Sequence, residues 1–167
     1  MVTPAVERGR PPLTGDERTL LTAFLDFHRA TPRVRCAHLS DATARRAVLP
    51  PLITPILVVA HLRWLEYFWC EVVLAGRHGR APYTEDDPAV DFKVHEDTTL
   101  EQVLDDYERQ CQSSREILAA LDLDHEVDWH DRRTSVRWVF LHLIEETARH
   151  NGHLDAVREL VEGATVE

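Results

Sequence analysis

The chain has 167 residues and a formal net charge of -10, with 29 acidic against 19 basic side chains. Such an acidic protein lacks the positive footprint of a nucleic-acid-binding protein and would be repelled by an anionic membrane surface. We therefore predict a small-molecule or protein partner, and neither nucleic acid nor membrane.

The cysteines and the N-terminal residues bear on the cellular compartment in which the protein is expected. The three cysteines, Cys36, Cys70 and Cys111, are widely separated and form no C-x-x-C pair, so neither a thiolate zinc site nor a disulfide framework is supported. The N-terminal residues lack the apolar core of a signal peptide, and the longest apolar run, PLITPILVVAHL, is too short to span a bilayer. These features predict a protein of the reducing cytoplasm.

The first third of the chain predicts one helix behind an extended lead-in. Residues 1–13 contain three prolines, and we expect a single domain over residues 14–163. Thr14 followed by Glu17 has the pattern of a capping box, and apolar residues then recur at helical spacing to about Leu39. Pro32 should kink this helix or end it early. A connector with a short helical turn follows over residues 40–55.

A second helix is predicted from about Thr54 to Ala75, where Gly76 ends it. Its apolar stripe consists of Leu57, His61, Trp64, Leu65, Phe68 and Val72. The polar segment 77–98 that follows is long and rich in turn-forming residues, which is typical of a lid or a binding loop.

The second half of the chain predicts two more helices. Thr98 and Glu101 have the pattern of a capping box at the start of a third helix, whose apolar residues continue to Leu121. Residues 122–134 form a polar link with a short extended piece, and a fourth helix runs from residue 134 or 135 to about Val161. No stretch alternates with period two for long enough to build a sheet. The sequence therefore predicts an all-α four-helix bundle.

The fourth helix carries an unusual density of titratable residues in the stretch EETARHNGHLD, residues 145–155. Glu146 and His150 are one helical turn apart and lie on or beside the apolar stripe, so that their side chains could share one metal ion. His150 with His153, and His142 with Glu146, are rival pairs that spacing alone ranks only slightly lower. Ordinary ion pairs on a solvated helix face, Glu145 with Arg149 and Glu146 with His150, are a further alternative, which suits Glu145 and Arg149 better.

A third ligand would have to come from a facing helix, and His61 is the matching exception in the apolar stretch ILVVAHLRWLEYFW. Buried titratable groups are normally paired or bound to metal. With Glu146 and His150, His61 would complete a His-Glu-His site with an open coordination position, which is typical of catalytic rather than structural sites. The alternative is that His61 is a hydrogen-bonded core histidine.

Three further residues near these candidates have unusual positions. His28 lies near the core face of the first helix, and Asp155 lies two residues beyond His153, where it could orient an imidazole. Gly152 in mid-helix costs about 1 kcal/mol relative to alanine. The glycine could allow another helix or a ligand to approach closely. Alternatively, the helix simply tolerates a poor helix former here.

Four segments of the chain resemble a known family. They are FLDFHRATPRVRCAHLSD, VLPPLITPILVVAHLRWLEYFW, YTEDDPAVDF and SVRWVFLHLIEETARHNGHLDAVRELVEG, and the likeness extends from about Thr14 to Gly163. The chain is similar to the DinB-like superfamily of metalloenzymes. Within it, the chain resembles an actinobacterial branch with an E-x-x-R-H-x-G-H-x-D signature, related to mycothiol-dependent maleylpyruvate isomerase and mycothiol S-transferases.

The resemblance implies a DinB-like four-helix bundle of up-down-down-up connectivity with a metal near its open end. It carries the ligand positions over to His61, Glu146 and His150, where Glu146 stands in place of the middle histidine of the three-histidine members. Further residues that could contact the ligands or the substrate are His153, Asp155, Arg149 and His28. The resemblance also implies a thiol cosubstrate, mycothiol or bacillithiol in characterised relatives.

The function predicted from these features is a metal-dependent transferase that activates a low-molecular-weight thiol, mycothiol, for S-transfer to a small electrophile. A divalent cation would lower the pKa of the thiol, with zinc favoured over nickel, iron and manganese. Two alternatives stay open: a non-catalytic metal-binding bundle of a stress response, and a metal-dependent hydrolase that needs no thiol. Exposed helix faces are compatible with a homodimer.

Overall fold

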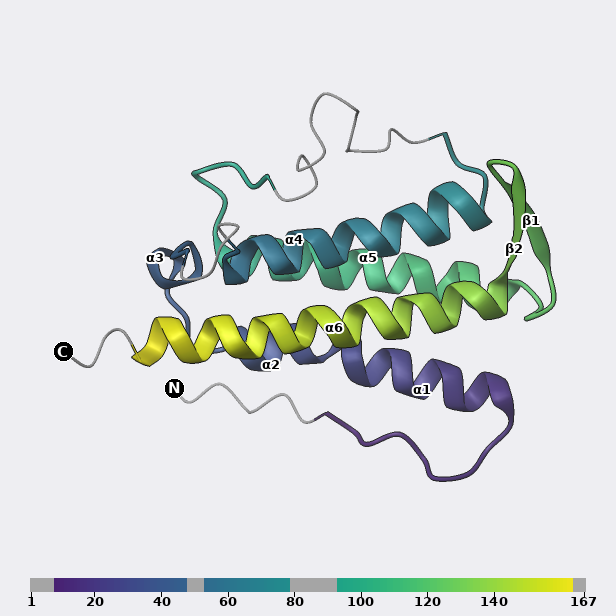
Figure 1. Ribbon diagram of the computed structural model, residues 1–167, viewed down its shortest axis with the longest axis horizontal. Coiled ribbons are helices and arrows are strands. Elements are labelled where there is room, and N and C mark those ends of the chain that lie inside the picture. Colours follow the sequence, from purple (N-terminus) through teal and green to yellow (C-terminus); the bar gives the residue numbers. More distant parts are fainter. Residues whose placement is uncertain (1–7, 48–52, 79–92, 164–167) are drawn as a thin grey trace.

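The computed structural model describes residues 8–47, 53–78 and 93–163, and these residues form a helical bundle with one small hairpin (Figure 1). The elements, in chain order, are α1 (Glu17–Arg29), α2 (Thr31–Cys36), α3 (Asp41–Ala44), α4 (Pro55–Glu66), η1 (Tyr67–Leu74), α5 (Leu100–Ala120), β1 (Glu126–Trp129), β2 (Arg132–Ser135) and α6 (Val136–Gly163). α2 continues the line of α1, and the π-helix η1 continues α4, so the bundle has four helical segments. The all-α prediction is confirmed.

The connectivity of the bundle is up-down-down-up, as predicted. α1 and α6 run in one direction in Figure 1, and α4 and α5 run in the other. Because α4 and α5 are parallel neighbours, a long connection must return the chain from the end of η1 to the start of α5. The predicted lid or binding loop, 77–98, is this connection, and its residues 79–92 lie outside the described part of the chain.

The core consists of two apolar clusters stacked along the bundle. One contains Leu62 and Leu154, and the other contains Leu25 and Leu143. On α6, the fully buried positions between Leu143 and Leu154 are Thr147 and Asn151, which are polar. The apolar interior is therefore interrupted at the level of α6 where Glu146 and His150 lie.

Helix caps differ from the predicted ones by one or two residues. Asp16 caps α1 instead of Thr14, because its Oδ1 accepts a hydrogen bond from the Thr19 amide at 2.9 Å. The capping box of α5 consists of Thr99 and Gln102 instead of Thr98 and Glu101. Both predicted boxes were wrong because several residues near each helix start can accept the same orphan amides.

Pro32 ends the first helix, as predicted. α1 stops at Arg29, and α2 begins at Thr31 with the proline in its first turn. A proline has no amide hydrogen and is tolerated only where a helix begins, since the first amides of a helix have no intrahelical partner.

The second predicted helix is continuous in space but changes its winding. Thr54 caps α4 as expected, and from Tyr67 onward the helix is a π-helix. The buried residues of η1 are Trp69, Cys70 and Leu74, whereas Phe68 and Val72 of the predicted stripe are only half-buried. The predicted stripe is already displaced within α4, where Leu57, His61, Trp64 and Leu65 are half-buried and the buried apolar residues include Ile56, Val59 and Leu62. Gly76, with φ +61°, ends the segment in the left-handed conformation that glycine adopts without strain.

The polar link before α6 contains a two-stranded antiparallel hairpin in which Trp129 pairs with Arg132. This hairpin is the short extended piece that the sequence predicted. Trp129 packs against Trp69 of η1 with their ring centroids 5.0 Å apart, which attaches the hairpin to the end of the bundle. Among the described residues, no helix is both long enough and apolar enough to cross a bilayer.

Gly152 lies in the middle of α6, and a Cβ placed on it would meet no described atom within 4 Å. The structure therefore does not support the close approach of another helix at this position. We expect Gly152→Ala to raise the free energy of unfolding by about 0.5–1 kcal/mol, because alanine restricts the unfolded backbone and favours the helix. Urea denaturation measures this change, and a destabilised variant would show that the site needs a residue without a side chain.

Candidate metal centre

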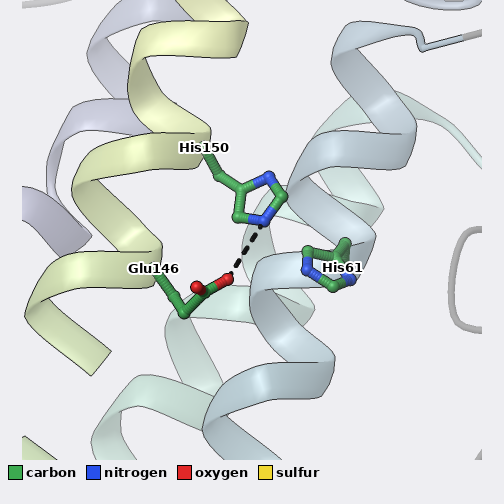
Figure 2. Close-up of side chains that lie close together, drawn as sticks. All are labelled: His61, Glu146 and His150. Carbon is green, nitrogen blue, oxygen red and sulfur yellow. Dashed lines mark ion pairs between the residues drawn. The ribbon is translucent and has the colours of Figure 1, made fainter. Parts of the chain in front are cut away.

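His61, Glu146 and His150 converge from two antiparallel helices, α4 and α6 (Figure 2). Each offers one ligand atom, and these atoms all lie within 4.8 Å of one another. His150 Nε2 lies 3.5 Å from Glu146 Oε2, and the rings of His61 and His150 have centroids 4.4 Å apart. The three residues singled out as ligands in the sequence are thus brought together, while their binding of a metal stays a prediction.

The three side chains lie at the rim of the core. Glu146 and His150 each expose 14% of their side chain, and His61 is also half-buried. Their helices share one apolar cluster, in which Leu62 of α4 and Leu154 of α6 are buried, and this packing fixes the two backbones against each other. The site is therefore held by packed helices and still reaches solvent, as a site that admits a small molecule must.

Arg149 binds the carboxylate of Glu146 from the solvent side. Its Nη1 lies 2.7 Å from Glu146 Oε1, and its Nη2 lies 2.5 Å from Glu145 Oε1. The ordinary ion pair predicted between Glu145 and Arg149 is thus present, and Arg149 also engages Glu146. Because the guanidinium occupies one carboxylate oxygen, the other oxygen is left facing His150.

His150 is in the protonation state that a metal ligand requires. Burial, and next to it the proximity of His61, lowers the pKa of His150 to about 4, although the charge of Glu146 opposes this change. The imidazole is therefore neutral near pH 7. A neutral imidazole can bind a cation without first releasing a proton.

The lowered pKa of His150 predicts how the metal-free protein responds to acid. In the unfolded chain the imidazole has an ordinary pKa of about 6.5, so between about pH 6.5 and 4 the folded chain binds fewer protons than the unfolded chain. Above about pH 6.5 His150 costs the folded state nothing. As the pH falls from about 6.5 to 4, the free energy of unfolding decreases, because the unfolded chain takes up the proton more readily. We expect the metal-free wild type to lose more stability over this range than His150→Gln, in urea denaturation with a chelator present. Equal losses in the two proteins would contradict the assignment.

The rival pairings involve more exposed side chains. His142, Glu145 and Glu146 form a second group whose ligand atoms lie within 4.8 Å of one another. Glu145 is exposed, however, and Arg149 already pairs with both carboxylates of this group. Glu145 Oε2 lies 3.9 Å from His142 Nδ1, but the greater exposure of Glu145 makes this group the more solvated of the two. His153 is exposed and belongs to neither group among the described residues, although its ring centroid lies 5.4 Å from that of His150.

Two other candidates from the sequence contact different partners. Asp155 forms an ion pair with Arg35 of α2, with 2.6 Å between the Arg35 Nε and an oxygen of the carboxylate. The carboxylate is thus engaged by a guanidinium, and not by the imidazole that the sequence suggested. His28 is half-buried at the end of α1, and its backbone carbonyl accepts a hydrogen bond from Asn151 Nδ2 at 2.9 Å. Burial lowers the pKa of the His28 imidazole.

Sequence reasoning missed an aromatic cluster beside the three residues. Trp138 stacks on His142 with ring centroids 4.8 Å apart and an interplanar angle of 15°. The ring of Trp69 packs against both, with centroids 5.0 Å from Trp138 and 4.8 Å from His142. Trp138 is 43% exposed, and His142 lies one helical turn before Glu146. The four-residue spacing of Trp138, His142 and Glu146 on one helix face is the feature of the sequence that could have indicated this arrangement.

The protein's own thiols are unsuited to nucleophilic chemistry. Cys36, Cys70 and Cys111 are all free and buried. Burial raises the pKa of Cys36 and of Cys70 to about 12 and also raises that of Cys111. Because the thiolate is the reactive form, a sulfur nucleophile would have to come from another molecule.

The donor set of His61, Glu146 and His150 fits a divalent cation such as zinc, which takes imidazole nitrogen and carboxylate oxygen ligands. Donor atoms arranged tetrahedrally around one zinc ion at about 2.0–2.2 Å lie about 3.3–3.6 Å apart. Since the ligand atoms here all lie within 4.8 Å of one another, side-chain rotation alone could bring them around one ion.

An up-down-down-up bundle with a histidine-carboxylate-histidine group between two of its helices is typical of the DinB-like class. The family model of the mycothiol-S-transferases matches residues 20–163. The chain therefore belongs to the mycothiol-S-transferase family, which confirms the predicted relationship and the prediction of a transferase enzyme. No curated protein matches the chain.

Proposed function

We propose that the protein is a metal-dependent transferase that activates mycothiol for S-transfer to a small electrophile. The observation that carries this proposal is the convergence of His61, Glu146 and His150 at a partly exposed position between α4 and α6. Membership of the mycothiol-S-transferase family supports the choice of thiol. The buried cysteines support an external rather than an internal sulfur nucleophile.

The charge of the three side chains suits the binding of a thiolate. Of the three proposed ligands only the Glu146 carboxylate is an anion, so a divalent cation bound through it and two imidazole nitrogens would keep a net positive charge. Such a cation acts as a Lewis acid that stabilises an anionic sulfur near neutral pH. His61, Glu146 and His150 would hold the cation, and Arg149 would keep the Glu146 carboxylate oriented through its 2.7 Å contact. We propose zinc, with nickel, iron and manganese as alternatives.

The proposal is tested by a conjugation assay on purified protein of known metal content. We expect mycothiol to be coupled to an electrophile such as 1-chloro-2,4-dinitrobenzene, with a rate that falls on chelation and recovers when zinc is returned. His150→Ala should abolish this rate, whereas His153→Ala serves as the matched histidine variant on the same helix. Full activity of metal-free protein would contradict the proposal.

Two other outcomes would identify the alternatives. Turnover of an ester or amide without any thiol would indicate a metal-dependent hydrolase. Stoichiometric metal without turnover across thiols and electrophiles would indicate a non-catalytic metal-binding bundle. A homodimer and a cytoplasmic location stay predictions, which sedimentation and cell fractionation would test.

A further inference from the structure

A buried ion pair joins the end of α1 to the end of α4. Arg29 Nε donates to Glu66 Oε1 at 2.8 Å, and Arg29 Nη2 donates to Glu66 Oε2 at 2.7 Å. The side chains expose only 2% and 1% of their surface. Removing two such charges from water costs about as much as their attraction returns, so stability alone does not explain the pair.

The neighbouring residue on α1 makes a second buried connection, to α6. Asn151 is 5% exposed, and its Nδ2 donates to the backbone carbonyl of His28 at 2.9 Å. In a continuous helix this carbonyl would accept from the amide of residue 32. That residue is Pro32, which has no amide hydrogen, so the carbonyl of His28 is available to Asn151.

These two connections reach the two helices that carry the proposed ligands. Glu66 lies on α4 with His61, five residues further along, and Asn151 directly follows His150 on α6. The pair also lies where the winding changes, because the π-helix η1 begins at Tyr67, the residue after Glu66. Fixing Glu66 therefore fixes the phase of α4 at its junction with the π-helix.

We propose that the last turn of α1 is a two-point clamp, in which Arg29 holds α4 through Glu66 and the His28 carbonyl holds α6 through Asn151. The clamp sets the distance and rotation between the two helices, and so places His61 opposite His150. Arg29, Glu66 and Asn151 are positioning residues of the proposed metal site. The inference rests on the proposed function for its metal readout, but the helix placement can be measured without metal.

The test separates positioning from stability by replacing the ion pair as a unit. In Arg29→Met/Glu66→Leu no unpaired charge is left, so the fold should persist. We expect zinc affinity, measured by competition with a chelating dye, to fall at least about tenfold, the lower end of the loss seen when residues that support metal ligands are removed. The absorption spectrum of the cobalt-substituted protein should change as well. Asn151→Ala, which leaves the ion pair intact, should weaken zinc binding in the same direction.

Arg33→Met is the matched control. Arg33 makes three ion pairs of 2.5–2.6 Å, with Glu101, Asp105 and Glu108, that join α2 to α5. Losing them should leave zinc affinity and the cobalt spectrum unchanged, because neither helix carries a proposed ligand.

The outcomes distinguish the clamp from the proposed function. If the wild type binds metal, unchanged affinity and spectrum in both the double variant and Asn151→Ala would overturn the clamp. If the wild type binds none, the proposed function fails, and the clamp is judged on crystal structures of the metal-free proteins. A shifted separation of His61 and His150 in the double variant would support the clamp, and an unchanged separation would refute it.

Discussion

His150→Ala is expected to weaken zinc binding by more than about 100-fold while leaving the helix content unchanged. Loss of a residue that merely supports a metal ligand costs about 10–100-fold in affinity, and removing the ligand itself should cost more. The fold should tolerate the change, because His150 lies at the rim of the core and alanine is the better helix former. Competition with a chelating dye gives the affinity, and circular dichroism gives the helix content.

His153→Ala is the control for this prediction, since it removes another imidazole from the same helix at an exposed position. Its zinc affinity should stay within a few-fold of the wild type. If both variants lost binding equally, His150 and His153 would have to be reconsidered as the ligand pair. If neither lost binding, the metal would lie elsewhere.

Arg29→Met is expected to lower the free energy of unfolding by about 3–5 kcal/mol, the usual cost of breaking a buried ion pair from one side. The variant leaves the carboxylate of Glu66 in the core with its two guanidinium donors removed. Urea denaturation of the metal-free protein measures the loss without a contribution from metal binding. A loss below about 1 kcal/mol would mean that water reaches Glu66 or that the pair is not formed in solution.

The double variant Arg29→Met/Glu66→Leu should recover most of that stability, because no unpaired charge remains in the core. The single variant Glu66→Leu completes the cycle and should be destabilised, since it leaves Arg29 without its buried carboxylate. The two single losses should therefore be far from additive in the double variant. Additive losses would show that the two side chains do not interact.

Local spacing singled out the candidate ligands but ranked rival pairs only slightly lower, and the family resemblance selected the set. Glu146 and His150 are one turn apart beside an apolar stripe, and His61 interrupts an otherwise apolar helix. The bundle could be predicted because helical periodicity is a property of neighbouring residues. The exact helix caps could not be predicted, because Asp16 and Thr14 are comparable acceptors for the first amides of α1.

Other features depend on contacts between residues far apart in the chain. Most residues of segment 56–74 are apolar, so helical spacing could not decide which of them face the core, and it placed the buried face of α4 and η1 on half-buried residues such as Trp64 and Phe68. Asp155 lies close in sequence to His153, which suggested an imidazole as its partner, whereas the structure pairs it with Arg35, 120 residues earlier. No rule of local spacing can identify such a partner.

The location of a bound cation tests the central claim most directly. Crystals of the zinc-loaded protein, measured at the zinc absorption edge, should show one strong anomalous peak about 2.0–2.2 Å from a nitrogen of His61, an oxygen of Glu146 and a nitrogen of His150. A peak bound by His142 and Glu145, or by His150 and His153 without His61, would contradict the account.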